Sequence, residues 1–334
     1  MTLRLPIIII IFFCIPCIAH SQKQESVKIR PIGELTNVQL EKDYAYYFFE
    51  ANQDYLVWYE GYTSMLFIYD IGASRVNKIA LSKGRGPNEF KKISGISILS
   101  DNIVYLSDHT NAKFIRIKAS GEFMEDAVPP NGLQPMTMVS DERYQVIMEA
   151  FSREAIFYLK EQDKENFHPL KLNGTEVIEE FPSIFQREGY LTIQNAYLIH
   201  LTKYYPYIYV YDLANIEMEK KIKFDESEVE EGRTMTNKEG TSMMYPPEKV
   251  GILNEDVSFI PGSANRIFLL ARGKSENRNY DLDKLYEYDF EKEKFITEYD
   301  LGINATEITI NDKYLFVYSE DDYKIYQYEI LPYK

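Results

Sequence analysis

Arg85 and Glu89 are the most distinctive pair of charged residues, because they lie in the glycine-rich segment KGRGPNEF at residues 83–90. Glycines on both sides of Arg85 allow a close approach of the backbone, and Pro87 restricts the residue before it to an extended conformation. Such a loop can present a guanidinium and a carboxylate to a polar ligand in a fixed geometry. The segment lacks the GxxxxGK[ST] spacing of a phosphate-binding loop. The same pattern also fits a rigid connector in which Phe90 packs into the core.

Other polar side chains fall in predicted loops that are far apart in the sequence. We include as candidate ligand contacts Glu60, Tyr62, Asp108, His109, Glu149, Arg153, Tyr204 and Arg272. The mixture of charges with tyrosines suits hydrogen bonding and stacking with a glycan or a peptide. Exposed loops of any protein also contain such residues, so the set alone does not identify a site.

Catalytic chemistry has little support in the sequence. Beyond the N-terminal segment the chain has His109, His168 and His200, and no two of them have the HExxH spacing of a zinc site. No GxSxG nucleophile motif is present. Cys14 and Cys17 are the only cysteines, and both lie in a segment that we expect to be removed. The sequence therefore predicts no catalytic residues and no resident cofactor.

The elements that would position the candidate residues recur along the chain. A strand of alternating aromatic and aliphatic residues occurs six times, with copies that begin at Phe67, Phe114, Phe157, Tyr209, Tyr286 and Tyr326. Each copy follows another short alternating segment, so each repeat predicts antiparallel strands. With one exception of 77 residues, successive copies begin 40 to 52 residues apart. This interval is typical of one four-stranded blade of a β-propeller.

We therefore predict an all-β chain, in which residues 22–334 form a single six-bladed β-propeller of four-stranded antiparallel blades. Residues 27–32 should complete the last blade, because a closed ring leaves no open strand edge. The long interval predicts an insertion at about residues 225–255, either functional or disordered, and a degenerate seventh blade is the alternative. A β-sandwich would not explain the regular repeat.

Residues 1–21 have the pattern of a signal peptide: Arg4, an apolar stretch over residues 5–18, and small residues at 19 and 21. The apolar stretch is too short to span a bilayer, so we predict export to the periplasm or the cell surface with no transmembrane span in the mature chain. A lipoprotein anchored through Cys17 is the alternative. A net charge of −15 argues against a nucleic-acid partner.

The motif GRGPNEF, the repeat and the N-terminal segment together resemble a family of secreted bacterial six-bladed β-propellers of unknown function, of the TolB-like or NHL-like type. In that family a Gly-x-Gly-Pro-x-Glu-aromatic motif follows an early outer strand, and residues 84–90 match it in full. The resemblance implies the fold and export but no activity. Some six-bladed propellers, notably lactonases, hold calcium in the central channel. By analogy Glu60, Asp108, Asn111 and Glu149 are candidate calcium ligands here.

These observations predict an exported, non-catalytic binding or scaffolding propeller. Its ligand would be a polar small molecule, a glycan, a peptide or a protein partner, bound on the face formed by the loops between blades. A calcium-assisted, lactonase-like hydrolase in the central channel is the alternative. A protein-interaction module built on residues 225–255 is a third reading.

Overall fold

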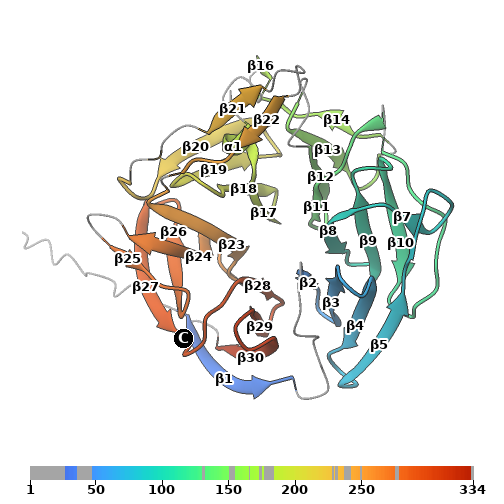
Figure 1. Cartoon of the computed structure of the whole chain (residues 1–334). Helices are drawn as coiled ribbons and strands as arrows, with labels where there is room; N and C mark the ends of the chain where they lie inside the picture. The colour runs from blue at the N-terminus through green and yellow to red at the C-terminus, as the bar shows by residue number, and fades with distance from the viewer. Residues whose placement is uncertain are drawn as a thin grey trace, which may run out of the picture.

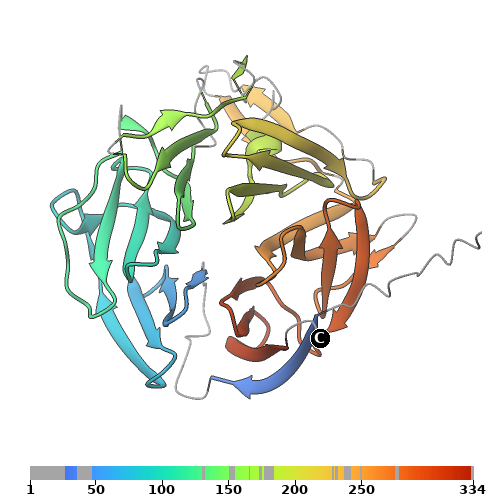
Figure 2. The ribbon, with the colours of Figure 1, turned by 180° about the vertical axis from the view of Figure 1, so that it is seen from behind.

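The computed structural model describes residues 27–35, 47–129, 132–149, 155–164, 166–172, 175–176, 184–227, 229, 232–236, 242–248, 250–274 and 278–331. Six antiparallel sheets are arranged as blades around a central axis (Figure 1). The view from behind shows the same closed ring (Figure 2). The predicted six-bladed β-propeller is therefore confirmed.

Within blades 1 to 5 the main strands follow one another in the chain from the axis outward. Blade 1 consists of β2 (Tyr47–Ala51), β3 (Tyr55–Glu60), β4 (Met65–Asp70) and β5 (Arg75–Ala80). Blade 3 consists of β11 (Thr137–Ser140), β12 (Tyr144–Met148), β13 (Phe157–Glu161) and β14 (His168–Pro169). Blade 4 consists of β17 (Gly189–Gln194), β18 (Tyr197–Thr202), β19 (Tyr207–Asp212) and β20 (Glu217–Lys223).

Blades 2 and 5 depart from four regular strands. Blade 2 has β8 (Ile93–Ile98), β9 (Ile103–Asp108) and β10 (Lys113–Lys118). Its outer edge is covered by an irregular segment, in which Ala127 exchanges two backbone hydrogen bonds with Phe114. Blade 5 has β23 (Ile252–Phe259), β24 (Arg266–Lys274), β26 (Lys284–Asp289) and β27 (Lys294–Asp300), and the short β25 (Asn279–Tyr280) also pairs with β24.

Blade 6 joins the two ends of the described chain. Its strands are β28 (Glu307–Ile310), β29 (Tyr314–Ser319), β30 (Lys324–Leu331) and β1 (Lys28–Glu34). The outermost strand β1 pairs antiparallel with β30, so that Lys28 lies opposite Leu331. Pro31, which has no N–H to donate, is tolerated because β1 is an edge strand. The N-terminal strand therefore closes the ring as predicted.

Both faces of a blade are covered by its neighbours, which explains the aromatic-rich strands. In β3, Trp58 packs toward Phe316 of blade 6, whereas Val57 belongs to the cluster shared with Val104 of blade 2. Trp58 also stacks on Phe67, with ring centroids 4.9 Å apart. Because successive side chains of a strand point to opposite faces, a strand between two neighbours is apolar at almost every position.

The remaining elements lie outside the blades. They are β6 (Ser82–Lys83), β7 (Glu89–Phe90), β15 (Lys171–Leu172), β16 (Thr175–Glu176), α1 (Ile184–Arg187), β21 (Arg233–Thr236) and β22 (Ser242–Tyr245). The hairpin of β21 and β22 lies within the predicted insertion, and the first strand of blade 5 begins in its last residues. Among the described residues no helix is long and apolar enough to cross a membrane. The proposed signal peptide lies outside the described residues.

Candidate functional site

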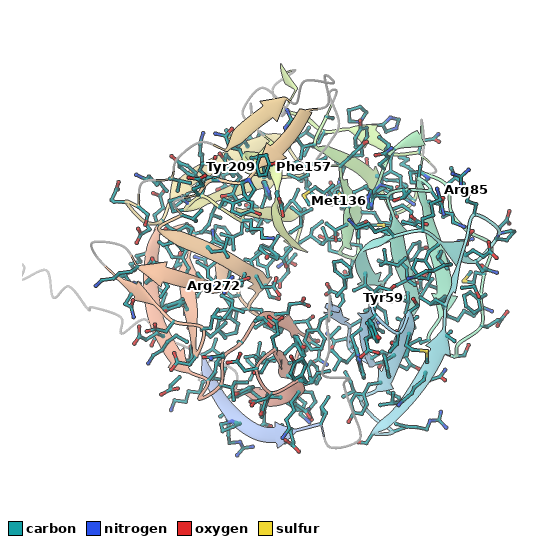
Figure 3. The ribbon with its side chains drawn as sticks, in the orientation of Figure 1. Tyr59, Arg85, Met136, Phe157, Tyr209 and Arg272 are labelled. Atoms are coloured by element: carbon teal, nitrogen blue, oxygen red, sulfur yellow. The ribbon has the colours of Figure 1, made fainter. Side chains whose placement is uncertain are left out.

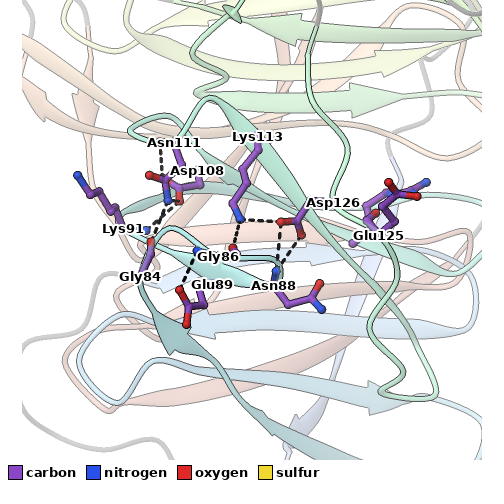
Figure 4. A network of polar contacts seen from close by, with 11 residues as sticks. Gly84, Gly86, Asn88, Glu89, Lys91, Asp108, Asn111, Lys113, Glu125 and Asp126 are labelled. Atoms are coloured by element: carbon purple, nitrogen blue, oxygen red, sulfur yellow. Dashed lines mark hydrogen bonds and ion pairs between the residues drawn. The ribbon is translucent and has the colours of Figure 1, made fainter.

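The glycine-rich loop is held in shape by its own glutamate. The two short strands at its ends, β6 and β7, pair in parallel. Within the loop the N–H of Gly86 donates to Oε2 of Glu89 over 2.8 Å (Figure 4). A Cβ on Gly84 would lie 2.0 Å from the same oxygen. The glycines are therefore needed so that the Glu89 carboxylate can lie against the backbone.

Side chains of blade 2 fasten this loop from the other side. The ammonium of Lys113 donates to the carbonyl oxygen of Gly86 over 2.8 Å and pairs with Asp126 over 2.6 Å (Figure 4). The amide of Asn111 donates to the carbonyl oxygen of Gly84 over 3.0 Å. Since the carboxylate of Glu89 and these carbonyls are bonded within the protein, the contacts support the connector interpretation of the motif.

Asp108 joins the loop to the turn of blade 2. Its buried carboxylate accepts hydrogen bonds from the N–H of Lys91 over 2.8 Å and from the side-chain amide of Asn111 over 2.8 Å. The neighbouring His109 is half-buried, and this burial, helped by the charge of Lys92, lowers the pKa of its imidazole, while the charge of Asp108 opposes the shift. Asp108 is thus committed to backbone and side-chain donors.

The remaining candidates are dispersed around the ring. Arg85 is exposed and lies at the outer rim, on the opposite side from Arg272 (Figure 3). Arg272 pairs with Glu255 over 2.6 Å. The ring of Tyr204 lies 5.9 Å from that of Phe185. Arg85 and Arg272 are therefore not brought together in one site.

Two further candidates are buried, and one lies fully at the surface. Glu60 is buried and accepts a hydrogen bond from the hydroxyl of Thr63. Glu149 is buried and accepts from the N–H of Gln134 over 3.3 Å. Tyr62 is 65% exposed. Arg153 lies outside the described residues. Ligand contact by any of these residues stays a prediction.

A cavity of the described residues lies at the opposite ends of the inner strands. It has a volume of about 940 Å³ and is lined by all six blades, through the last residues of β2, β8, β11, β17, β23 and β28 and the turns that follow them. Loops between blades lie at the first residues of those strands. Because neighbouring strands are antiparallel, the cavity opens on the other face from the predicted contacts.

The wall of this cavity is joined from blade to blade by hydrogen bonds. Five of these links are Asn52 Nδ2 to Leu99 O at 2.9 Å, Ala196 N to Asp141 Oδ2 at 2.9 Å, Gln194 Nε2 to Ser263 O at 2.9 Å, Ile308 N to Asp256 Oδ2 at 2.8 Å and Ala51 N to Thr309 Oγ1 at 2.9 Å. The hydroxyl of Ser97 donates to the carbonyl oxygen of Met138 at the remaining interface. The cavity is therefore built on a rigid, closed framework.

Three carboxylates gather where blades 1, 5 and 6 meet at the axis. Burial raises the pKa of Asp256 to about 8, although N–H donors oppose the shift and the charge of Glu50 adds to it. Burial likewise raises the pKa of Glu50 to about 7. For Glu307, burial and then the charge of Asp256 raise the pKa well above its usual range. Glu50 and Asp256 are therefore partly protonated at neutral pH.

The sequence analysis missed these three residues, although a local signal locates the strands of Glu50 and Glu307. Asn52, Asp141 and Asn311 each end an inner strand, and each accepts backbone hydrogen bonds from residues two and three positions later. In every case the residue three positions later is a tyrosine. This recurring Asx turn marks the first turn of a blade, and hence the strand that carries Glu50.

Metal-binding groups are scarce. The part of the chain that the structure describes contains no group of three or more His, Cys, Asp or Glu side chains close enough to hold a metal ion. The proposed calcium ligands Asp108 and Asn111 are bonded to each other over 2.8 Å. The geometry therefore gives the metal-assisted alternative no specific support.

Comparisons with known proteins agree with the architecture. No match was found among the curated proteins. A member of the DUF4221 family from Bacteroides vulgatus has a similar structure, with a TM-score of 0.53, 12% identity and coverage of 92% of this chain and 96% of the other. Virginiamycin B lyase from Staphylococcus aureus gives a TM-score of 0.52 at 10% identity, covering 92% of this chain and 100% of the other. At such identities these likenesses show the fold alone. Residues 35–248 match the family DUF5128, described as a 6-bladed beta-propeller, and the chain belongs to that family.

Proposed function

We propose that this chain is an exported, non-catalytic binding propeller that holds a polar ligand in the axial cavity. The observation that carries the proposal is a cavity of about 940 Å³ to which all six blades contribute. Ligand sites of small molecules are typically clefts of roughly 300–1,000 Å³ with a few convergent polar groups. Here Glu50, Asp256 and the hydroxyl of Thr192 are among the lining residues.

The face formed by the loops between blades has weaker support as the binding surface. Its most distinctive loop directs the Glu89 carboxylate to the N–H of Gly86. By contrast, the cavity collects side chains from distant parts of the sequence around a common axis. Loops and strand ends on a rigid scaffold commonly carry function in this way.

A cavity-filling variant tests the proposal. Thr192→Trp would place a large ring in the cavity, and Lys78→Ala on the outer strand of blade 1 is its control. A panel of glycans, short peptides and small polar molecules would be measured by thermal shift, since a ligand that binds the native state raises the melting temperature. We expect stabilisation of the wild type and of Lys78→Ala, and none of Thr192→Trp. Equal stabilisation of all three proteins would overturn the proposal.

The alternative of a metal-assisted hydrolase in the same channel rests on likeness of fold alone, since some six-bladed propellers, notably lactonases, hold calcium there. It predicts that calcium raises the melting temperature and that EDTA lowers it. The absence of either response, together with stabilisation by a polar ligand in EDTA, would favour the binding propeller.

A further inference from the structure

We infer that the axial cavity is a site for an organic cation, and that an ammonium group of the ligand is anchored by Glu50 and Asp256, with Glu307 beside them. The inference rests on the proposed function, because it names the ligand class of the same cavity.

Asp256 is held in a fixed position at the axis. A register shift in β23 falls between Asn254 and Asp256. The N–H of Val257 donates to Oδ1 of Asp256 over 2.7 Å, and the N–H of Ile308 donates to Oδ2 over 2.8 Å. A bulge commonly re-aims a side chain, and here it directs the carboxylate across the inner edge of β28. Its two hydrogen bonds hold the group in this orientation.

Glu50 approaches β28 from blade 1. Its Oε1 accepts a long hydrogen bond of 3.4 Å from the hydroxyl of Thr309, and the backbone of Ala51 also favours the ionised carboxylate. That hydroxyl also accepts the N–H of Ala51 over 2.9 Å, so the position of Thr309 is fixed by both blades. No cationic side chain of the described residues pairs with Glu50. Its charge is therefore free to interact with a group that enters the cavity.

Glu307 stands beside this pair of carboxylates, at the start of β28. It is half-buried and is not among the residues that line the cavity, and its side chain makes no hydrogen bond or ion pair with any described residue. The charged groups that influence its pKa are all acidic, and they are Asp256, Glu255, Glu320 and Glu50. Without a cation nearby, such a carboxylate favours its neutral, protonated form. A ligand that brings a positive charge would favour the ionised form instead.

The cations nearest to this cluster are already engaged. Arg272 pairs with Glu255 over 2.6 Å, and Lys203 pairs with Glu188 over 3.1 Å. Among the described residues that line the cavity, the one cation is Arg143, which lies over the ring of Tyr144. The lining carboxylates are Glu50, Asp54, Asp141, Glu142, Asp256 and Asp312. The wall is therefore strongly acidic, as is the chain with its net charge of −15.

The dimensions favour an organic cation over a bare metal ion. A calcium ion takes six to eight oxygen ligands at about 2.3–2.6 Å. No three acidic side chains of the described residues converge that closely. A volume of about 940 Å³ instead accommodates a ligand with several polar atoms. Hydroxyl and amide groups of Ser97, Thr192 and Gln194 line the rest of the wall and can receive such atoms.

Proton release should accompany binding. A positive charge beside these acids favours their ionised forms and lowers their pKa values, so affinity should rise as the pH increases from 6.0 to 8.5. Other titratable or charged groups surround the cluster and contribute to its electrostatic field. They are Tyr190 and Glu188 of blade 4, Lys203 after β18, Glu255 and Arg272 of blade 5, and Glu320 after β29.

The test uses the full chain and the triamine spermidine as the probe, with affinity measured by titration calorimetry. Triethylene glycol and glutarate are the neutral and anionic probes. Glu307→Gln and Glu50→Gln remove one carboxylate each, and Glu122→Gln, at an exposed ion pair with Lys118, is a matched control for loss of one charge. We expect spermidine to bind, each cavity variant to weaken it about tenfold or more, and the control to change it less than about twofold.

The outcomes separate the inference from the proposed function. If spermidine fails to bind, or binds Glu307→Gln and Glu50→Gln as tightly as Glu122→Gln, the organic-cation inference is overturned. If calcium binds in its place with the same dependence on these residues, the ligand class is wrong. If glutarate or triethylene glycol binds and Thr192→Trp blocks it, the inference falls while the binding propeller stands. If Thr192→Trp binds every probe as tightly as the wild type does, the proposed function is overturned as well.

Discussion

The glycine-rich loop and the axial cavity use charged groups in opposite ways. In the loop the carboxylates of Glu89 and Asp126 are bonded to donors of the protein itself. In the cavity the carboxylate of Glu50 accepts a long hydrogen bond from Thr309 and pairs with no cationic side chain of the described residues. The loop is conspicuous in the sequence, whereas the cavity residues stand in ordinary strand segments. A distinctive motif thus reports a demanding backbone geometry, and unpaired charge reports a place for a ligand.

The largest expected effect comes from the carboxylate that joins the loop to blade 2. Asp108→Ala would leave several N–H groups without their acceptor in a buried position, among them that of Lys91. We expect a loss of about 3 kcal/mol or more in the free energy of unfolding, measured by denaturant titration. Asp101→Ala is the control, because the exposed carboxylate of Asp101 accepts one bond of 3.1 Å from the N–H of Ile103. Equal losses in the free energy of unfolding for the two variants would contradict this structural role of Asp108.

A pH-dependent effect is expected at Glu50. Its pKa of about 7 in the folded chain exceeds that of an unfolded glutamate, about 4.3. The folded state therefore holds more protons between those values, and wild-type stability falls as the pH rises through that window. Glu50→Gln cannot ionise, so it should exceed the wild type by about 1–2 kcal/mol at pH 8.5 and match it at pH 4. Glu122→Gln should show no such dependence. A constant difference for Glu50→Gln at all pH values would contradict the assignment.

A smaller effect tests the internal bond of the loop. Gly84→Ala would displace the Glu89 carboxylate from the N–H of Gly86, and Glu89→Ala would remove that carboxylate altogether. Each change should cost about 1 kcal/mol, the net contribution of one hydrogen bond. Because both changes break the same contact, the double variant should cost little more than either single variant. If the two losses of stability add up in thermal melts, Gly84 and Glu89 act independently and do not share this contact.

The blade repeat and the closure by the N-terminal strand were predictable, because strands covered on both faces have an unmistakable apolar pattern at a regular interval. The candidate site was not predictable to the same extent. Glu50, Asp256 and Glu307 meet only because blades 1, 5 and 6 converge at the axis, and no spacing in the sequence expresses that convergence. The short inner strands β11 and β28 also carry a weaker pattern than their neighbours. The polar loop residues predicted a site on the opposite face, because a sequence does not distinguish a polar residue that is merely exposed from one that binds a ligand.

The smallest expected effect is that of Arg85→Ala, which tests directly whether the loop face binds a ligand. The guanidinium is exposed at the outer rim, so its removal should change the free energy of unfolding by less than about 0.5 kcal/mol. It should also leave spermidine affinity unchanged, because the cavity opens on the other face. Loss of binding for a glycan or peptide in Arg85→Ala, with spermidine binding intact, would instead establish a second surface on the loop face. The glycines of the motif would then serve both to place Glu89 and to present Arg85.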